Sequence, residues 1–209
     1  MANSVAITLI RHGLTKSNQE KRYLGWTDEL LCLKGRKELE MLIQNNYPVG
    51  ELLITSDLKR CQETAEILYP GQSIETSTFF RECHFGDWEK KTYEELKNDS
   101  AYRKWINNPI HVQPPNGESL EQFQQRIELG WKRLISLVEM KQITSVVIIC
   151  HGGTIRTLLE KYAPKSKGFW NWSVGFGCGY TLICEREHLR RGMRCTSLQV
   201  APSTEKGSG

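Results

Sequence analysis

The chain has 209 residues, enough for one domain with a sizeable core, and 39% hydrophobic and 25% charged residues are typical of a globular protein. The formal net charge is +4 and no long run of like charges occurs, so composition gives no reason to expect a nucleic-acid partner. No stretch approaches the roughly eighteen apolar residues of a membrane span, and no signal peptide is recognisable. We expect a cytoplasmic protein that binds neither nucleic acid nor membrane.

Seven cysteines occur, an odd number without a Cys-x-x-Cys pair. In a chain long enough to build its own core, this pattern is typical of reduced thiols in a cytosolic compartment. Two cysteines directly precede histidines, at Cys83-His84 and Cys150-His151. Neighbouring residues on a strand point to opposite faces, so each pair offers one metal ligand at most. No structural metal is expected.

The first element in chain order is a short β-branched run at residues 5–10, which predicts a buried strand. Arg11, His12 and Gly13 follow it without a spacer. In an α/β sheet, ligands bind where the chain leaves the carboxyl end of a strand. A guanidinium, an imidazole and a flexible glycine at that point favour an anionic ligand. We interpret His12 as a nucleophile toward phosphorus.

Helices and strands are then expected to alternate. The patterns predict a helical turn within 15–22, a helix at 33–45, a strand at 51–55, a helix at 58–68 after the N-cap pair Ser56-Asp57, and a strand at 74–80. Arg60 lies early in the second of these helices, where it can face the same sheet edge as His12. Without that context, a solvated position would be the usual one for an arginine.

Residues 81–117 are less regular, with a helix expected at 93–105. Glu82 follows the third strand and precedes an aromatic, glycine-rich loop. Such surroundings can desolvate a carboxyl group, raise its pKa and keep it protonated as a general acid, although an isolated glutamate is more often exposed. We interpret residues 82–117 as an insertion that covers the site.

The remaining chain is expected to form a long amphipathic helix at 120–140, a strand at 145–150, a helix at 154–162, strands at 180–184 and 194–200, and a disordered tail at 201–209. The strand at 145–150 runs directly into His151 and Gly152. Parallel strands would place this second histidine beside His12. We predict one domain over residues 1–200, a three-layer α/β/α sandwich around a mostly parallel sheet.

Four segments together carry a characteristic order of residue types. They are Arg11-His12-Gly13 with Thr15 and Asn18, residues 56–65, Arg81-Glu82 with residues 85–89, and residues 150–156. In this order they resemble the signature of the histidine phosphatase superfamily (branch 1), also called phosphoglycerate mutase-like. Leu14, Cys61 and Glu63 depart from the residue types usual in that family, which leaves any substrate contact at position 14 open.

The resemblance implies a phosphomonoesterase that works through a phosphohistidine intermediate without a metal or other cofactor. The implied catalytic residues are His12 as nucleophile, Glu82 as the acid and later the base, and His151. The implied phosphate-binding residues are Arg11, Asn18, Arg60 and Gly152. The partner is expected to be a small-molecule phosphate ester, bound by a monomer or homodimer.

Three functions stay open at this point. The short chain and brief covering segment favour hydrolysis over the phosphoglycerate mutase reaction, and intact His12, Glu82 and His151 argue against a non-catalytic phospho-ligand-binding protein. Residues 85–89, residues 115–119 with Phe123 and Arg126, and residues 170–182 are similar to α-ribazole phosphatases of cobalamin biosynthesis and to broad-specificity phosphatases of bacilli. A wall for a ring-bearing substrate such as α-ribazole 5'-phosphate, or alternatively core packing, would account for the aromatic residues His84, Trp88, Tyr93 and Trp105.

Overall fold

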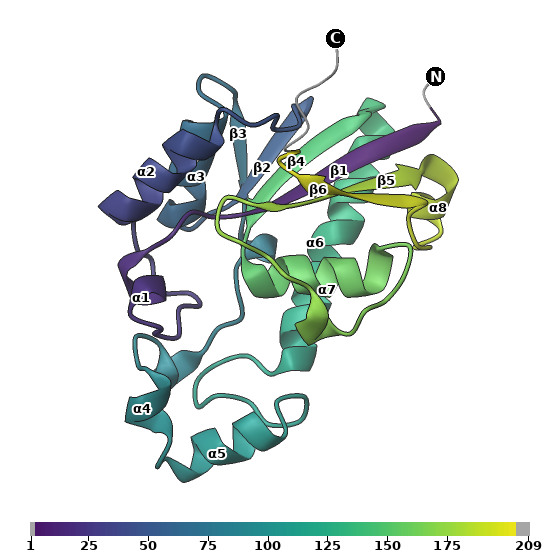
Figure 1. Ribbon diagram of the computed structural model, residues 1–209. Coiled ribbons are helices and arrows are strands. Elements are labelled where there is room, and N and C mark those ends of the chain that lie inside the picture. Colours follow the sequence, from purple (N-terminus) through teal and green to yellow (C-terminus); the bar gives the residue numbers. More distant parts are fainter. Residues whose placement is uncertain (1–2, 204–209) are drawn as a thin grey trace.

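The computed structural model describes residues 3–203, in which six strands form one sheet with helices on both faces (Figure 1). The strands are β1 (Ser4–Arg11), β2 (Leu52–Ser56), β3 (Ile74–Ser77), β4 (Ser145–Cys150), β5 (Gly179–Glu185) and β6 (Ser197–Ala201). Their order is β3-β2-β4-β1-β5-β6. The first four are parallel, and β5 runs antiparallel to both of its neighbours. The expected α/β class with a mostly parallel sheet is confirmed.

Two pairs of helices cover the sheet. Helices α2 (Leu33–Leu42) and α3 (Lys59–Leu68) lie on one face, and α6 (Leu120–Lys141) and α7 (Gly152–Tyr162) lie on the other (Figure 1). The shorter elements are α1 (Lys16–Gln19), α4 (Tyr93–Leu96), α5 (Ser100–Asn107), α8 (Arg186–Arg190) and the 3-10 turns η1 (Thr78–Phe80), η2 (Gly86–Trp88) and η3 (Phe169–Asn171). No helix within residues 3–203 is both long and apolar enough to cross a membrane.

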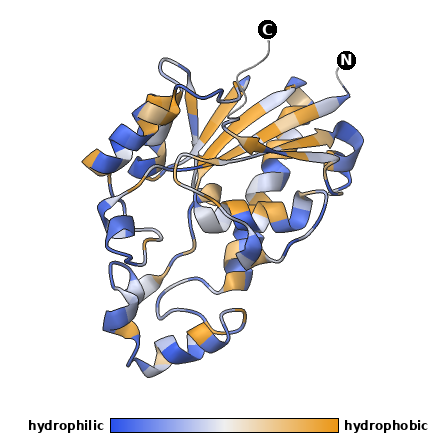
Figure 2. Ribbon diagram, in the orientation of Figure 1, coloured by the Kyte–Doolittle hydropathy of each residue, from blue (hydrophilic) through white to orange (hydrophobic). Residues whose placement is uncertain are grey.

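The sequence of β4 explains why the sheet has two covered faces. Val146, Ile148 and Cys150 pack into the core beneath α6 and α7. Val147 and Ile149 pack into the core on the side of α2 and α3. Because successive side chains of a strand point to opposite faces, a strand buried on both sides needs an unbroken apolar run. Figure 2 shows hydrophobic colour along the central strands, while hydrophobic and hydrophilic residues alternate along the helices.

Several element boundaries differ from the sequence prediction. Residues 93–105 form two helices, since Asp99 accepts hydrogen bonds from the backbone N–H groups of Ala101 and Tyr102 and so starts α5 anew. The third strand ends at Ser77 because η1 follows it. The expected disordered tail is wrong at its start, where β6 includes Ala201 and Ser203 pairs with Asn46. The rest of that tail, residues 204–209, lies outside the described residues.

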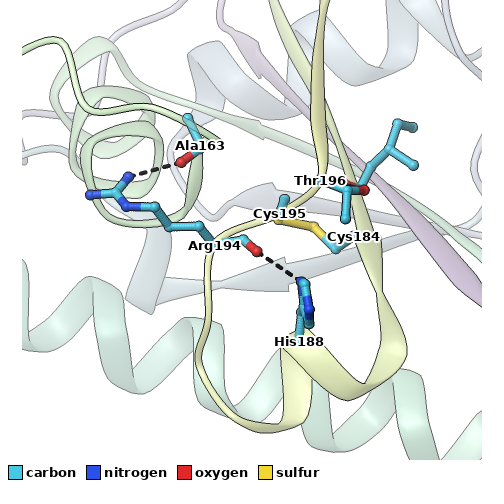
Figure 3. The surroundings of a disulfide bond; sticks show 7 residues. Ala163, Cys184, His188, Arg194, Cys195 and Thr196 are labelled. Atoms are coloured by element: carbon cyan, nitrogen blue, oxygen red, sulfur yellow. Dashed lines mark hydrogen bonds between the residues drawn. A yellow bond between two sulfur atoms is a disulfide. The ribbon is translucent and has the colours of Figure 1, made fainter.

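Cys184 and Cys195 form a disulfide bond, which corrects the expectation that all cysteines are reduced (Figure 3). Cys184 lies on β5, and Cys195 lies in the segment that leads from α8 to β6. This segment is fixed by hydrogen bonds from the Cys195 N–H to the Tyr162 carbonyl and from the Thr196 N–H to the Ile183 carbonyl. The other cysteines, Cys32, Cys61, Cys83, Cys150 and Cys178, are free thiols.

Helices α4 and α5 form a lobe that lies apart from the sheet, at the lower end of the view in Figure 1. The lobe has a small core of its own, in which Trp88, Leu96 and Tyr102 are buried and Tyr23 and Trp105 pack against them. The lobe therefore gains its order from local aromatic packing and not from the central sheet.

Candidate active site

His12 and His151 lie side by side because β1 and β4 are adjacent parallel strands that end together. Their register pairs Arg11 with Cys150, the residues directly before the two histidines. The imidazole centroids are 5.1 Å apart in an edge-to-face arrangement. Both rings are buried, with 4% of His12 and 0% of His151 exposed. The two strand–histidine–glycine segments thus meet at one edge of the sheet.

Two features make His12 suited to nucleophilic attack. Its Nδ1 lies 2.7 Å from the carbonyl oxygen of Gly13, so this nitrogen carries the proton and donates it, and Nε2 keeps its lone pair. Burial, together with the charges of Arg60 and Arg11, lowers the pKa of His12 well below its ordinary value of 6.5. The imidazole is therefore neutral at neutral pH, the form in which it can attack phosphorus.

Arg11 and Arg60 bring two buried cations to the same edge. Arg60 donates to the carbonyl oxygens of Gly25 and Thr27. Arg11 donates to the carbonyl oxygen of Val174. Burial lowers the pKa of Arg11 to about 10 and also lowers that of Arg60. The Nε atoms of both arginines are buried without a hydrogen-bond partner. Unpartnered buried donors are costly, and an anion with several acceptor oxygens would satisfy them.

His151 is held by a neighbour on each side of its ring. Its Nδ1 lies 3.2 Å from the Arg60 guanidinium, which can only donate, so the proton belongs on Nε2 and points at Ser56 Oγ, 2.9 Å away. Burial and the charge of Arg60 lower the pKa of His151 well below 6.5.

The interpretation of Ser56-Asp57 as an N-cap pair is wrong, because Leu58 occupies the N-cap position of α3 and no side chain caps it.

Glu82 reaches the site across the start of α7. One carboxylate oxygen accepts the backbone N–H of Gly153 at 2.8 Å, and the other accepts that of Cys83 at 3.0 Å. A Cβ atom at position 153 would lie 2.3 Å from Glu82 Oε1, so a side chain there would displace the carboxylate from this position. A Cβ at Gly152 would contact the guanidinium groups of Arg11 and Arg156. The first turn of α7 therefore borders the carboxylate and two of the cations.

Asn18 lies in α1, and its Oδ1 takes part in the capping box of that helix by accepting from Thr15. Only its amide –NH2 group could donate to a phosphate oxygen.

Phe176 is a neighbour of the site that sequence reasoning missed. Its ring centroid lies 3.9 Å from Arg11 Cζ and 5.9 Å from the centroid of His12. No local pattern signals this residue, because it reaches Arg11 through the tertiary pairing of the segment before β5 with β1.

A cavity of about 250 Å³ opens beside Glu82 and Gly153. Three charged side chains line it, namely Glu82, Glu118 and Arg156. Its aromatic lining is made by Tyr23, Phe85, Trp105, Phe123, Phe169 and Trp170. The cavity is thus an aromatic recess that adjoins the cluster of histidines and arginines.

The aromatic wall predicted from sequence is correct only for Trp105. Trp88 is buried in the small core of the lobe, which is the core-packing alternative. Tyr93 is 54% exposed, and the ring of His84 packs at a tilt against Trp26, with the ring centroids 4.8 Å apart. None of these three lines the cavity. Among residues 3–203, no three His, Cys, Asp or Glu side chains are grouped so that they could hold a metal ion.

Comparison with known proteins agrees with this geometry. The sequence profile of the histidine phosphatase superfamily (branch 1) matches residues 7–196. The adenosylcobalamin/alpha-ribazole phosphatase of Escherichia coli (strain K12) is 28% identical over 176 residues, which cover 81% of this chain and 85% of that protein. Phosphoglycerate mutase-like protein 4 of Arabidopsis thaliana is 30% identical over 169 residues, with coverage of 77% and 72%. The structure of the alpha-ribazole phosphatase from Shigella flexneri superposes with a TM-score of 0.82 at 25% identity, over 98% of this chain and 100% of that one.

Proposed function

Because the chain belongs to branch 1 of the histidine phosphatase superfamily and is a phosphatase, we propose that it hydrolyses a small phosphomonoester through a phosphohistidine intermediate on His12. One observation carries the proposal: His12 is buried and neutral, with its proton held on Nδ1 by Gly13, beside two guanidinium groups whose Nε atoms lack a partner. A phosphate group would supply both the electrophile and the missing acceptors.

In the proposed first step, the lone pair on His12 Nε2 forms a bond to phosphorus while the bond from phosphorus to the leaving oxygen breaks. Arg11 and Arg60 neutralise the charge on the equatorial oxygens, and Asn18 and the N–H of Gly152 at the start of α7 donate hydrogen bonds. His151 lies beside His12 and is proposed to contact the equatorial oxygens as well, which requires its ring to exchange its hydrogen bond with Arg60 or Ser56 for one with the phosphate.

Glu82 is proposed to transfer the protons in both steps. In its neutral, protonated form it first gives its proton to the leaving alkoxide, which departs as an alcohol. Glu82, now a carboxylate, then takes a proton from the water that attacks phosphorus, while the bond from Nε2 to phosphorus breaks and inorganic phosphate forms. Its position at the boundary between the cluster of cations and the aromatic cavity suits a group that must reach the leaving oxygen.

For the substrate, we propose a phosphomonoester whose leaving alcohol carries an aromatic ring, with α-ribazole 5'-phosphate as the particular compound. The aromatic lining of the cavity supports a ring next to the phosphate site. Relatives whose names state activity on alpha-ribazole phosphate support the particular compound. We also propose that residues 82–117 cover the site within one domain. A cytoplasmic location and a monomeric or homodimeric state stay predictions.

The experiment that tests the proposal measures hydrolysis of p-nitrophenyl phosphate and of α-ribazole 5'-phosphate in the presence of a chelator. His12→Ala should abolish turnover of both, because no other nucleophile lies at this position, whereas the exposed His111→Ala should retain it. Acid-labile phosphate should be trapped on His12 during turnover of the wild-type protein.

Two results would contradict the proposal. Retention of phosphate esters without turnover would indicate a binding protein. Interconversion of phosphoglycerates that depends on added bisphosphate, with little hydrolysis, would indicate a mutase.

A further inference from the structure

Arg126 is a largely buried arginine of α6 whose guanidinium is fully occupied by the protein. Its Nε and one Nη pair with the two oxygens of Glu118, each at 2.7 Å. The remaining N–H groups donate to the carbonyl oxygens of Phe79 at 2.8 Å, Arg81 at 3.1 Å and Glu82 at 3.0 Å. A guanidinium has five N–H donors, so none is left for a substrate. Arg11 and Arg60 differ from it, because the Nε atom of each is buried without a hydrogen-bond partner.

Glu118 and Trp26 hold the same stretch of backbone as Arg126. Glu118 accepts the backbone N–H of His84 at 3.0 Å. Trp26 donates its indole N–H to the carbonyl oxygen of Glu82 at 3.0 Å. The Trp26 ring also faces two guanidinium groups, with Arg126 Cζ 5.6 Å from its centroid. Residues 81–85 belong to no helix or strand, so these side chains take the place of regular structure there.

The result is that Glu82 is fixed at both ends. Its carboxylate is held by the N–H groups of Gly153 and Cys83, and its carbonyl oxygen receives the donors of Arg126 and Trp26. A carboxylate on an irregular segment would otherwise sample several positions. A catalytic group that moves by about 1 Å can lose roughly 100-fold in rate.

We propose that Arg126, together with Glu118 and Trp26, is a positioning residue that holds Glu82 within reach of the leaving oxygen. This inference rests on the proposed function, in which Glu82 protonates the leaving group. Arg126 touches neither substrate nor phosphate. It reaches Glu82 through the backbone carbonyl oxygens of Phe79, Arg81 and Glu82, and Glu118 provides the negative charge that makes its burial tolerable.

The test compares kcat/KM for an alkyl ester, ribose 5-phosphate, with that for p-nitrophenyl phosphate, whose leaving group needs little proton assistance. Arg126→Lys, which keeps the charge but loses the planar fork, should lower kcat/KM on the alkyl ester by about 10- to 100-fold and on the aryl ester by about threefold or less. Trp26→Phe removes a single N–H donor. It should also lower kcat/KM more for the alkyl ester than for the aryl ester, but by smaller factors than Arg126→Lys. Competitive inhibition by inorganic phosphate should be unchanged, because Arg11 and Arg60 are untouched.

The matched control is Glu139→Gln, which breaks another partly buried pair on α6, that with Arg186. It should lower the melting temperature without altering the ratio of the two kcat/KM values. If Arg126→Lys lowers kcat/KM equally for both substrates, or lowers only the melting temperature, Arg126 is a structural residue and the inference is wrong. If Arg126→Lys does not fold, Trp26→Phe decides by the same criterion.

Glu82→Gln separates failure of this inference from failure of the proposed function. If Glu82→Gln lowers kcat/KM for both esters equally, Glu82 is not the acid, and both its proposed proton transfer and the positioning role of Arg126 are wrong. If Glu82→Gln slows the alkyl ester selectively and Arg126→Lys does not, only the positioning role is wrong. The double variant should be no slower on the alkyl ester than Glu82→Gln alone, since both changes act through one carboxylate.

Discussion

At the scale of single residues, the buried charges of the site decide which groups carry protons. Burial disfavours the imidazolium form of His12 and His151, and the guanidinium of Arg60 adds repulsion, so both pKa values fall well below 6.5. Arg11 keeps its charge at neutral pH even though burial lowers its pKa to about 10. The site therefore presents neutral imidazoles beside cations, an arrangement that a phosphate dianion would complete.

The free energy of unfolding should decrease as the pH falls below 6.5, because of these two histidines. Histidines of the unfolded chain take up protons near that pH, whereas His12 and His151 in the folded chain do not, so the unfolded state binds more protons and stability decreases. Each histidine contributes about 1.4 kcal/mol per pH unit, and the two together contribute about 2.7 kcal/mol per unit once the pH is well below 6.5. Urea denaturation at pH 7.5, 6 and 5 measures this slope.

Removing one of the two histidines should roughly halve that slope. His111→Ala, a change at an exposed histidine, should leave it as in the wild type. A free energy of unfolding that stays constant from pH 7.5 to 5 would show that the buried rings are not held neutral.

At the scale of elements, the aromatic cavity is made where α5 and η3 approach the first turn of α7. Trp105 comes from α5, and Phe169 and Trp170 come from η3. Trp105 is oriented by its packing against Trp88, Tyr102 and Phe85, with centroid distances of 5.3, 5.8 and 6.2 Å. The aromatic core of the lobe thus presents one indole ring to the cavity.

Trp105→Ala should weaken selection for ring-bearing substrates. Loss of one aromatic contact costs about 1–2 kcal/mol, so kcat/KM on α-ribazole 5'-phosphate should fall by about 5- to 30-fold. The value for ribose 5-phosphate, which has no aromatic ring to stack, should change little. Tyr93→Ala removes an aromatic side chain of the same lobe that does not line the cavity, and should leave both values unchanged. Equal losses on both substrates in Trp105→Ala would show that this wall does not select the ring.

At the scale of the whole molecule, the disulfide and the active site lie at opposite ends of the sheet. Cys184 pairs with Val5 at the start of β1, whereas His12 follows the other end of that strand. In Figure 3 the bond ties β5 to the segment after α8, next to the contact between Arg194 and the carbonyl oxygen of Ala163. The disulfide can therefore stabilise the fold without touching the catalytic groups.

Cys195→Ser should lower stability and spare activity. The two cysteines are 11 positions apart, and a disulfide that closes a loop of this size contributes roughly 3 kcal/mol by constraining the unfolded chain. For a chain of this length, that corresponds to a melting temperature lower by about 6–12 °C. Differential scanning calorimetry measures the shift, and kcat/KM on p-nitrophenyl phosphate at 25 °C should stay as in the wild type.

Cys32→Ser changes a free thiol that caps α2, and because serine can accept the same hydrogen bond from the Gly35 N–H, the melting temperature should not fall. Alkylation of the denatured, unreduced protein should label the five free cysteines and spare Cys184 and Cys195. Labelling of all seven would contradict the disulfide.

The sequence alone was sufficient to predict the sheet edge and the residues that converge on it. The unbroken apolar run of β4 reports burial on both faces, and its abrupt change to His151 and Gly152 marks the strand end. The same logic holds for β1 and His12. These inferences succeed because period and polarity are local properties, and because parallel strands necessarily bring their carboxyl ends to one edge.

Only the tertiary structure decided the contacts between residues that are distant in the chain. The hydroxyl group of Ser56 meets His151, Arg126 reaches the Glu82 carbonyl and Phe176 covers Arg11, although no local pattern marks these partners. The packing of the α4–α5 lobe places Trp105 in the wall of the cavity and buries Trp88. The chain reversal through α8 brings Cys195 next to Cys184. In each case the residue type permits several environments, and the free energy of packing the whole chain selects among them.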